Sequence, residues 1–433
     1  MWTTLKLQVT TPVFNSATPP GEGYLQARPE IRVTSLRGGM RYWLRAMAGT
    51  YVGDDLHRLR AVEDRVLGST KHASPIRLRI PRQPAASEKE LRELVPDREQ
   101  EQWVAYLLGP GLTTKGRAHT KDFIPPDEVF SLQVRLMGND QESKDAHRCA
   151  LAALWLNLTY GGLGARVHRG FGGLRVLGAE KGLPWDSDPT LIRSPDLAHY
   201  TKAEHLLFTG PAEESREALQ RICDATWDPD GDRPKRHIWE EEPTSPYPVL
   251  GKDHTLAGIN GTQQATIWPE VLAKAGQELR YFRARHDSPT PEGYDPPIKT
   301  EGWVDVIHDR ARKEKHLPMA GLGLPLVYKD QYEVRATKGR NGEVEQLRRA
   351  SPLWLRVVGE GNKRRLFSFA FWNVFLPESA SVDLWKGNTH RRQLTVDTQD
   401  AHALVEEWID GLRSGTSFIR RPSGITAAYT SHK

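Results

Sequence analysis

The sequence predicts an α+β fold, and three features of the chain support this prediction. Apolar and polar residues alternate in three short segments, the period of strands with one buried face: Leu5–Thr10, Ile76–Ile80 and Val129–Met137. Two longer segments, Ser35–Gly49 and Asp145–Leu158, carry apolar residues at helical spacing. Prolines and glycines gather between these segments and mark their ends. At 433 residues the chain is too long for one typical core, so two domains are expected.

The first half of the chain follows a β-α-β-β-α-β order with one interruption. Thr34 or Ser35 is a suitable N-cap for the first helix, and Gly49 is a suitable end. Segment 82–101 is polar and charged and is interpreted as an insertion between two strands. The second helix is followed by a glycine-rich loop and by the strand Leu174–Leu177. This order resembles the split βαβ unit of ferredoxin-like folds.

The second half of the chain gives weaker signals. Its expected elements are two helices and two strands: Trp268–Arg285, Ala401–Leu412, Leu353–Val358 and Leu366–Phe375. This content is compatible with a second, more diverged copy of the same α+β unit. Prolines and few apolar residues indicate a linker between the halves. The expected organisation is an N-terminal domain over 1–180, a linker over 181–200 and a C-terminal domain over 201–433.

The composition limits the class of protein. The chain contains no run of about 18 apolar residues, and its N-terminus lacks the layout of a signal peptide, so we expect no membrane span. Cys149 and Cys223 lie far apart, which gives neither zinc spacing nor a disulfide framework, and a reducing cytoplasm fits. Cys149 lies in an apolar helix and is interpreted as a small core residue. The net charge of +5 is a mild bias, so the positions of the charges matter more than their total.

The loop Tyr160–Leu174 is the most informative stretch of the sequence. Glycine lets a ligand approach the backbone closely, and arginine offers a planar donor fork that suits phosphate. The loop is therefore a candidate for contact with the phosphates of RNA or DNA, and the alternative is a surface turn with solvated arginines. Its candidate RNA-binding residues are Gly162, Gly164, Arg166, His168, Arg169 and Gly170.

A stripe of arginines follows the first predicted helix. Arg37, Arg41 and Arg45 are spaced by four, beside a stripe of apolar residues. Like charges at this spacing repel, at a cost of about 0.2–0.5 kcal/mol per pair, unless a partner neutralises them. RNA phosphates are one candidate partner, and acidic side chains of the same fold are the other. The sequence analysis favours RNA.

A second basic segment, 111–121, contributes Lys115 and Arg117 as further candidates for RNA contact. It lacks the Lys and hydroxyl residue that a nucleotide-binding P-loop requires after its last glycine. A flexible loop on a nucleic-acid backbone and a solvated hairpin tip are both compatible with it.

Histidine offers one route to catalysis, because it can serve as general acid or base in metal-free RNA cleavage. His168 is the best-placed histidine, with Tyr160 and Lys115 as potential assistants, but nothing in the sequence pairs these residues. No cluster of acids, histidines or cysteines has the spacing of a metal site. We therefore predict no catalytic residue, no cofactor and no metal.

Five segments together resemble a known family. The segment 29–46, with Arg37-Gly38-Gly39-Met40-Arg41, is similar to the signature helix of the RAMP superfamily of CRISPR proteins. Further similar segments follow in the expected order: Glu63 with Leu67-Gly68-Ser69, the glycine loop 161–172, Gly323-Leu324-Pro325 and Ser351-Pro352. Within the superfamily the chain looks most like the first-numbered subunit of the Cmr complex, the type III-B effector.

The resemblance implies two tandem ferredoxin-like, RRM-type domains with insertions. It also implies a non-catalytic subunit that holds the 3′ region of the guide RNA, beside other RAMP subunits, and that helps to capture target RNA. The guide would read the sequence by pairing, while the protein holds the shape of the backbone. Two alternatives stay open: a metal-independent endoribonuclease that matures guide RNA, and a scaffold whose arginines bind neighbouring subunits.

Overall fold

The structure is a computed structural model, and it describes most of the chain. The described residues are 1–15, 28–109, 112, 122–180, 182–184, 188, 190–227, 245–261, 265–286, 316–327, 331–340, 343–377, 379–396 and 398–419.

The first half contains a four-stranded sheet in the order β2-β3-β1-β4, in which all neighbours are antiparallel. Its strands are β1 (Thr3–Val9), β2 (Ile76–Arg79), β3 (Val129–Leu136) and β4 (Leu174–Ala179). The helix α1 (Val33–Val52) joins β1 to β2, and α4 (Gln141–Thr159) joins β3 to β4. The strand order and the two crossing helices agree with the β-α-β-β-α-β order predicted for this half.

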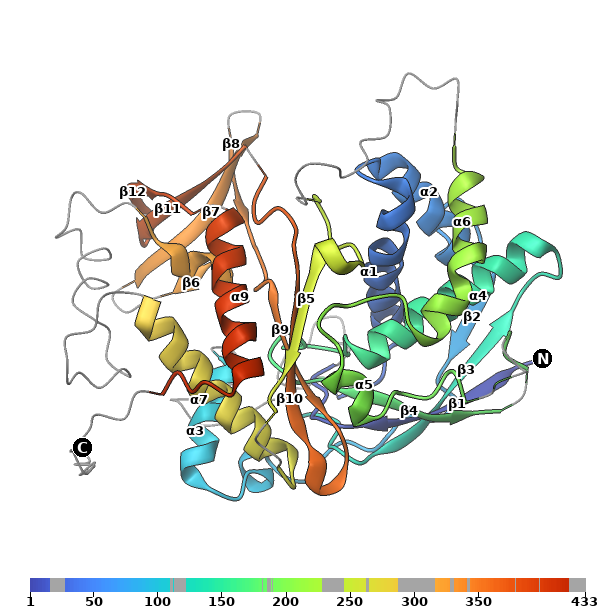
Figure 1. The fold of residues 1–433 in the computed structure, drawn as a ribbon, viewed down its shortest axis with the longest axis horizontal. Helices are drawn as coiled ribbons and strands as arrows, with labels where there is room; N and C mark the ends of the chain where they lie inside the picture. The colour runs from blue at the N-terminus through green and yellow to red at the C-terminus, as the bar shows by residue number, and fades with distance from the viewer. Residues whose placement is uncertain are drawn as a thin grey trace.

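Helices lie on one side of this sheet, with α4 packed directly against its strands (Figure 1). Two of them, α1 and α4, were predicted, and the apolar stripe of α1 is fully buried at Leu36, Met40 and Trp43. The sequence analysis missed the other two, α2 (Leu56–Leu67) and α6 (Arg216–Asp224). The short helix α5 (Leu197–Thr201) and the 3₁₀ turn η3 (Gly210–Ser215) lead into α6.

The second half is built around a three-stranded antiparallel sheet in the order β5-β10-β9. Its strands are β5 (Thr255–Ile259), β9 (Leu353–Val358) and β10 (Arg365–Phe371). The helices α7 (Trp268–His286) and α9 (Thr398–Ser414) pack against it, and α3 (Arg98–Leu108) packs on α7. The predicted elements of this half are confirmed within a few residues, except that the last strand ends at Phe371. The insertion 82–101 proves to contain the 3₁₀ turn η2 (Leu91–Leu94) and the start of α3.

A third sheet was not predicted from the sequence. Its order is β12-β11-β7-β6, and β8 pairs with β7. The strands are β6 (Leu326–Val327), β7 (Tyr332–Arg340), β8 (Glu343–Leu347), β11 (Ala380–Lys386) and β12 (Thr389–Leu394). Three short 3₁₀ turns complete the described elements: η4 (Lys252–His254), η5 (Pro318–Leu322) and η7 (Gly361–Lys363).

The largest core joins the two halves. Trp43 of α1 and Tyr160 at the end of α4 pack against Phe369 of β10, with ring centroids 6.1 and 6.0 Å away. In Figure 1, β9 and β10 run between the helices of the first half and those of the second. Cys149 and Cys223 are both free and fully buried, so the prediction that Cys149 is a core residue is confirmed.

Arg356 of β9 ties the second half to the first. Its side chain is 5 % exposed, and its guanidinium donates hydrogen bonds to four carbonyl oxygens of the first half, those of Leu158, Thr159, Gly161 and Leu174. The first three belong to the C-terminal end of α4 and the residues just after it, where carbonyls lack helical partners. Burial lowers the pKa of this guanidinium to about 10. The start and the end of the glycine loop are therefore held by one residue of a distant strand.

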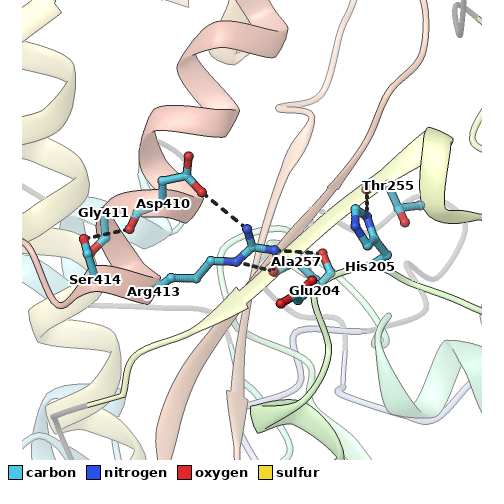
Figure 2. Close-up of polar contacts among 8 residues, drawn as sticks. All are labelled: Glu204, His205, Thr255, Ala257, Asp410, Gly411, Arg413 and Ser414. Atoms are coloured by element: carbon cyan, nitrogen blue, oxygen red, sulfur yellow. Dashed lines mark hydrogen bonds and ion pairs between the residues drawn. The ribbon is translucent and has the colours of Figure 1, made fainter.

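Figure 2 shows a second tie, between α9 and β5. Arg413 donates to the carbonyl oxygens of Ala257 at 3.0 Å and Glu204 at 2.9 Å, and Asp410 lies 3.3 Å from its guanidinium. The final helix is thereby fixed to the edge of the second sheet. Among the described residues, no helix is both long and apolar enough to cross a membrane.

Candidate nucleic-acid interface

A groove of about 510 Å³ lies between the start of α1, the glycine loop and β9. Three predicted site residues line it: Gly162, Gly164 and His168. The other lining residues are Phe14, Asn15, Ser35, Gly39, Tyr42, Trp43, Leu112, Asp122, Asn157, Leu163, Ala165, Val167 and Trp354. The groove therefore combines aromatic walls with amide and hydroxyl groups, the composition of a ligand site.

Asn157 is the most unusual residue of the groove wall. It is 3 % exposed, and its Nδ2 has no hydrogen-bond partner among the described residues. A Cβ added at Gly39 would lie 2.4 Å from its Oδ1, and one added at Gly161 would lie 2.6 Å from the same atom. Glycines of α1 and of the glycine loop thus leave the space that this amide fills. An unsatisfied buried donor costs about 1–3 kcal/mol, which an acceptor on a bound ligand would offset.

The N-terminus of α1 opens on the same groove. The N-cap residue Arg32 makes no side-chain cap, and the first turn contains no acid. Ser35 lines the groove, and its hydroxyl donates to the side chain of Asn15 at 3.1 Å. Backbone N–H groups at the start of a helix attract anions, phosphate included. This end of the groove suits a phosphate, whereas the aromatic walls suit a base.

His168 forms one wall of the groove by packing on Trp354. Its ring stacks on the indole with centroids 3.6 Å apart and an interplanar angle of 26°, and its Nδ1 lies 2.9 Å from the carbonyl oxygen of Ser351. Burial lowers the pKa of this imidazole to about 4. The ring is therefore neutral near pH 7, and it can stack or share a hydrogen bond but supplies no charge. The carbonyl of His168 also accepts a hydrogen bond from the N–H of Leu355, which docks the loop on β9.

The other three candidates of the glycine loop face away from the groove. The guanidinium of Arg166 donates to the carbonyl of Leu108 at the end of α3, although this side chain was predicted to meet phosphate. Arg169 lies near Arg283 and Tyr106, and burial followed by the charge of Arg283 lowers its pKa to about 10. Gly170 has φ +86°, and a Cβ there would lie 2.5 Å from Leu272 of α7. These residues hold the loop against α3 and α7.

The arginine stripe of α1 makes contacts within the protein. Arg41 and Arg45 each bind one oxygen of Glu63 in α2, at 2.7 and 2.6 Å. Arg37 donates to the carbonyls of Leu67 at 3.0 Å and Ile76 at 2.6 Å. These contacts match the second candidate partner, an acid of the same fold, although Arg45 keeps half of its side chain exposed. RNA contact by the stripe stays a prediction.

Two predicted candidates, Lys115 and Arg117, lie outside the described residues. Among the groove-lining residues that the structure describes, Asp122 carries the only formal charge at neutral pH. Among all the residues that the structure describes, no cluster of three or more histidines, cysteines and acids could hold a metal ion.

Thirteen of the groove-lining residues were not predicted as site residues, and the most notable of them are Asn157, Trp354 and Tyr42. Asn157 had a signal, because it is the single amide in the otherwise apolar end of a helix that leads directly into the glycine loop. No feature of the sequence pointed to Trp354, because only the packing of the second half against the first brings β9 next to His168.

Comparison with known proteins bears directly on this region. Residues 6–175 match the RAMP superfamily. The matched residues include α1, the glycine loop, β2 and β3, together with most of β1 and the first two residues of β4. The resemblance stated from the sequence motifs is thereby confirmed.

Two curated relatives from Pyrococcus furiosus are similar to the chain. The CRISPR system Cmr subunit Cmr1-1 is 24 % identical over 357 residues, which cover 82 % of this chain and 84 % of that protein. The subunit Cmr1-2 is 28 % identical over 178 residues, 39 % of this chain and 92 % of that protein. The crystal structure of P. furiosus Cmr1 in its apo form shares the fold, with a TM-score of 0.51 at 19 % identity, and the match covers 94 % of this chain and 97 % of that one.

Proposed function

We propose that this chain is an RNA-binding, non-catalytic subunit of a type III-B CRISPR (Cmr) effector complex. In this proposal it holds the 3′ region of the guide RNA, stands beside other RAMP subunits in the cytoplasm and helps to capture target RNA for antiviral defence. The RAMP match and the similarity to Cmr1 subunits support the membership of such a complex. The groove supports the contact with RNA.

The observation that carries the RNA contact is the position of Asn157. Its buried amide nitrogen has no hydrogen-bond partner among the described residues, and it lies between two glycines at a groove that also offers helix N–H groups and an aromatic wall. Phosphate suits the start of α1, and an unpaired base suits the wall formed by Trp354 and His168. A single-stranded segment of RNA presents both groups next to each other.

The same proposal includes two tandem ferredoxin-like modules. The second half runs β5, α7, β9, β10 and α9, with β10 between β5 and β9. This is the order of the first half without its last strand, and the third sheet is formed by segments inserted around β9 and β10. We keep the division into residues 1–180 and 201–433, joined by 181–200, as part of the proposal.

The arrangement of His168 favours the non-catalytic role over the endoribonuclease. Tyr160, its proposed assistant, is 2 % exposed, and its hydroxyl lies 2.6 Å from Nε2 of His199, a different histidine. His168 itself is fixed between Trp354 and the carbonyl of Ser351. Among the described residues, no second acid or base is seen to hydrogen-bond with its ring.

The substitution Asn157→Ala tests the groove. Binding of a fluorescein-labelled polyuridine to the full chain is measured by anisotropy, with Asn139→Ala as the matched control. Asn139 is exposed beside the opposite end of α4. We expect Asn157→Ala to weaken binding about tenfold, the effect of one lost hydrogen bond worth about 1.4 kcal/mol, and the control to bind as wild type. Equal affinities for both variants would contradict the role of the groove.

Affinity purification of the tagged chain from its native cells tests the assembly. Recovery of several partner subunits together with short RNAs of uniform 5′ sequence supports the proposal. Recovery of the chain alone, with precursor RNA cut at one position, overturns it in favour of the endoribonuclease. The scaffold alternative requires partner subunits whose recovery is lost in Arg37→Glu and Arg41→Glu variants that still bind RNA.

A further inference from the structure

One face of the first sheet points away from α1 and α4 (Figure 1). The strand residues on this face are all basic or uncharged. Alternation along the strands buries residues such as Leu5, Leu132 and Val134 on the helix side. The residues between them project to the other side, and the register places them next to one another. We call this surface the sheet face and define it by Lys6, Arg77, Arg79 and Arg135 together with Thr4, Gln8, Ser131 and Gln133. None of the four strands contains an aspartate or glutamate.

The cations of the sheet face lie close together without acidic partners. Arg77 is directly opposite Arg135 in the β2–β3 pair, and like charges in this position destabilise a sheet. Lys6, Arg77 and Arg135 are exposed. Within the described part of the chain, no ion pair involves these three residues or Arg79. The neighbouring Arg175 differs, because it pairs with Glu360.

One cation of the sheet face is held in position. The guanidinium of Arg79 lies 4.2 Å from the ring centroid of Trp2, and its Nε donates to Oε1 of Gln133 at 2.7 Å. Gln133 in turn donates to the hydroxyl of Thr4 at 3.3 Å. A guanidinium restrained in this way loses less conformational freedom when it binds an anion. Of the remaining polar side chains, Gln8 donates to the carboxylate of Asp127 at 3.2 Å and accepts from Arg175 at 2.8 Å, whereas the hydroxyl of Ser131 can donate to the oxygens of phosphate or ribose.

We propose that the sheet face binds the sugar–phosphate backbone of single-stranded RNA, as a second contact separate from the groove. This inference rests on the proposed RNA-binding function. Neighbouring strands and alternate residues place cations about 5–7 Å apart, so several can meet successive phosphates. An acidic protein surface is a poorer match, because the centre of a protein interface is apolar, whereas the sheet face is polar and charged throughout its defined residues. The most exposed large apolar residue of these strands, Val129, is 43 % exposed and is the first residue of β3.

The test reverses the two opposed cations in the full chain. The double variant Arg77→Glu/Arg135→Glu is compared with Arg60→Glu/Arg98→Glu, which changes the net charge equally at exposed arginines of α2 and α3. The probe is fluorescein-labelled polyuridine over a series of salt concentrations. We expect the sheet-face variant to bind at least tenfold more weakly than its control. The slope of log K against log salt should fall by about one to two, since each phosphate contact on a single strand contributes about 0.7.

A milder variant guards against misfolding. Arg77→Gln/Arg135→Gln removes the like-charge pair, so it should melt no lower than wild type while it still loses affinity and salt dependence. Binding equal to that of the control variant overturns the sheet-face proposal and leaves the groove intact, because Asn157→Ala tests the groove separately. Retained RNA binding together with lost partner subunits also overturns it, and assigns the face to an acidic protein. A wild-type chain that binds no RNA overturns both proposals.

Discussion

His168 stacks on Trp354 with ring centroids 3.6 Å apart, although the two residues belong to different halves of the chain. The stack closes one wall of the groove and, with the bond to Ser351, fixes the orientation of the imidazole. Burial disfavours the charged form of this ring and lowers its pKa.

The first prediction concerns pH. The folded chain keeps His168 and His147 neutral down to about pH 4, whereas an unfolded chain protonates histidine near pH 6.5. The unfolded state therefore binds more protons between these values, and the free energy of unfolding falls as the pH falls from about 6.5 to about 4. Thermal melting of wild type and His168→Gln across this range measures the effect. We expect a steeper loss for wild type, and parallel curves would contradict the buried neutral histidine.

The second prediction concerns Arg356. Replacement by lysine leaves at least one of its four carbonyl partners without a donor, because an ammonium has three N–H groups and cannot reproduce the planar fork. We expect the free energy of unfolding to fall by about 3 kcal/mol or more. Denaturant unfolding checks this, with Arg60→Lys on the exposed side of α2 as control. A loss equal to that of the control would show that the four bonds contribute little.

The third prediction concerns the arginine stripe. If Glu63 is the true partner of Arg41, a double-mutant cycle of Arg41→Ala and Glu63→Ala gives a coupling energy of about 1–2 kcal/mol in the free protein. The exposure of Arg41, about a third, keeps the value modest. A coupling energy near zero, combined with a large loss of RNA affinity in Arg41→Ala, would instead support the hypothesis that the arginine stripe contacts RNA.

The fourth prediction contrasts two glycines. Gly170→Ala forces a Cβ against Leu272 at a positive φ, and we expect a loss of about 1–3 kcal/mol. Gly38→Ala adds a Cβ that meets nothing within 4 Å in α1, and we expect a gain of about 0.5–1 kcal/mol from helix propensity. Both values come from denaturant titrations of the full chain. A harmless Gly170→Ala would mean that the loop does not need its contact with α7.

The sequence revealed those elements whose apolar pattern is regular. The helix α1 was predictable because Leu36, Met40 and Trp43 form an unbroken buried stripe. By contrast, β12 buries only Leu394, so its pattern cannot be told from a loop. The helix α2 was predictable in principle, since Asp55 caps it and Leu59, Val62 and Val66 repeat at helical spacing.

The candidate site was predictable only in part. The glycine loop stood out by composition, and three of its predicted site residues do line the groove. Which of its side chains face the groove could not be predicted. Their orientation depends on contacts with α3 and α7, which lie far from the loop in the sequence. The partner of Arg41 and Arg45 could not be predicted for a related reason. Glu63 belongs to α2, and the sequence analysis had not predicted that helix.

The contact between Arg356 and Gly161 spans 195 positions in the sequence. During synthesis, the glycine loop leaves the ribosome long before the residue that fixes it. The groove is therefore completed only when nearly the whole chain has been translated. A nascent or truncated chain that lacks β9 therefore lacks Trp354, and its glycine loop has no partner for the stacking of His168.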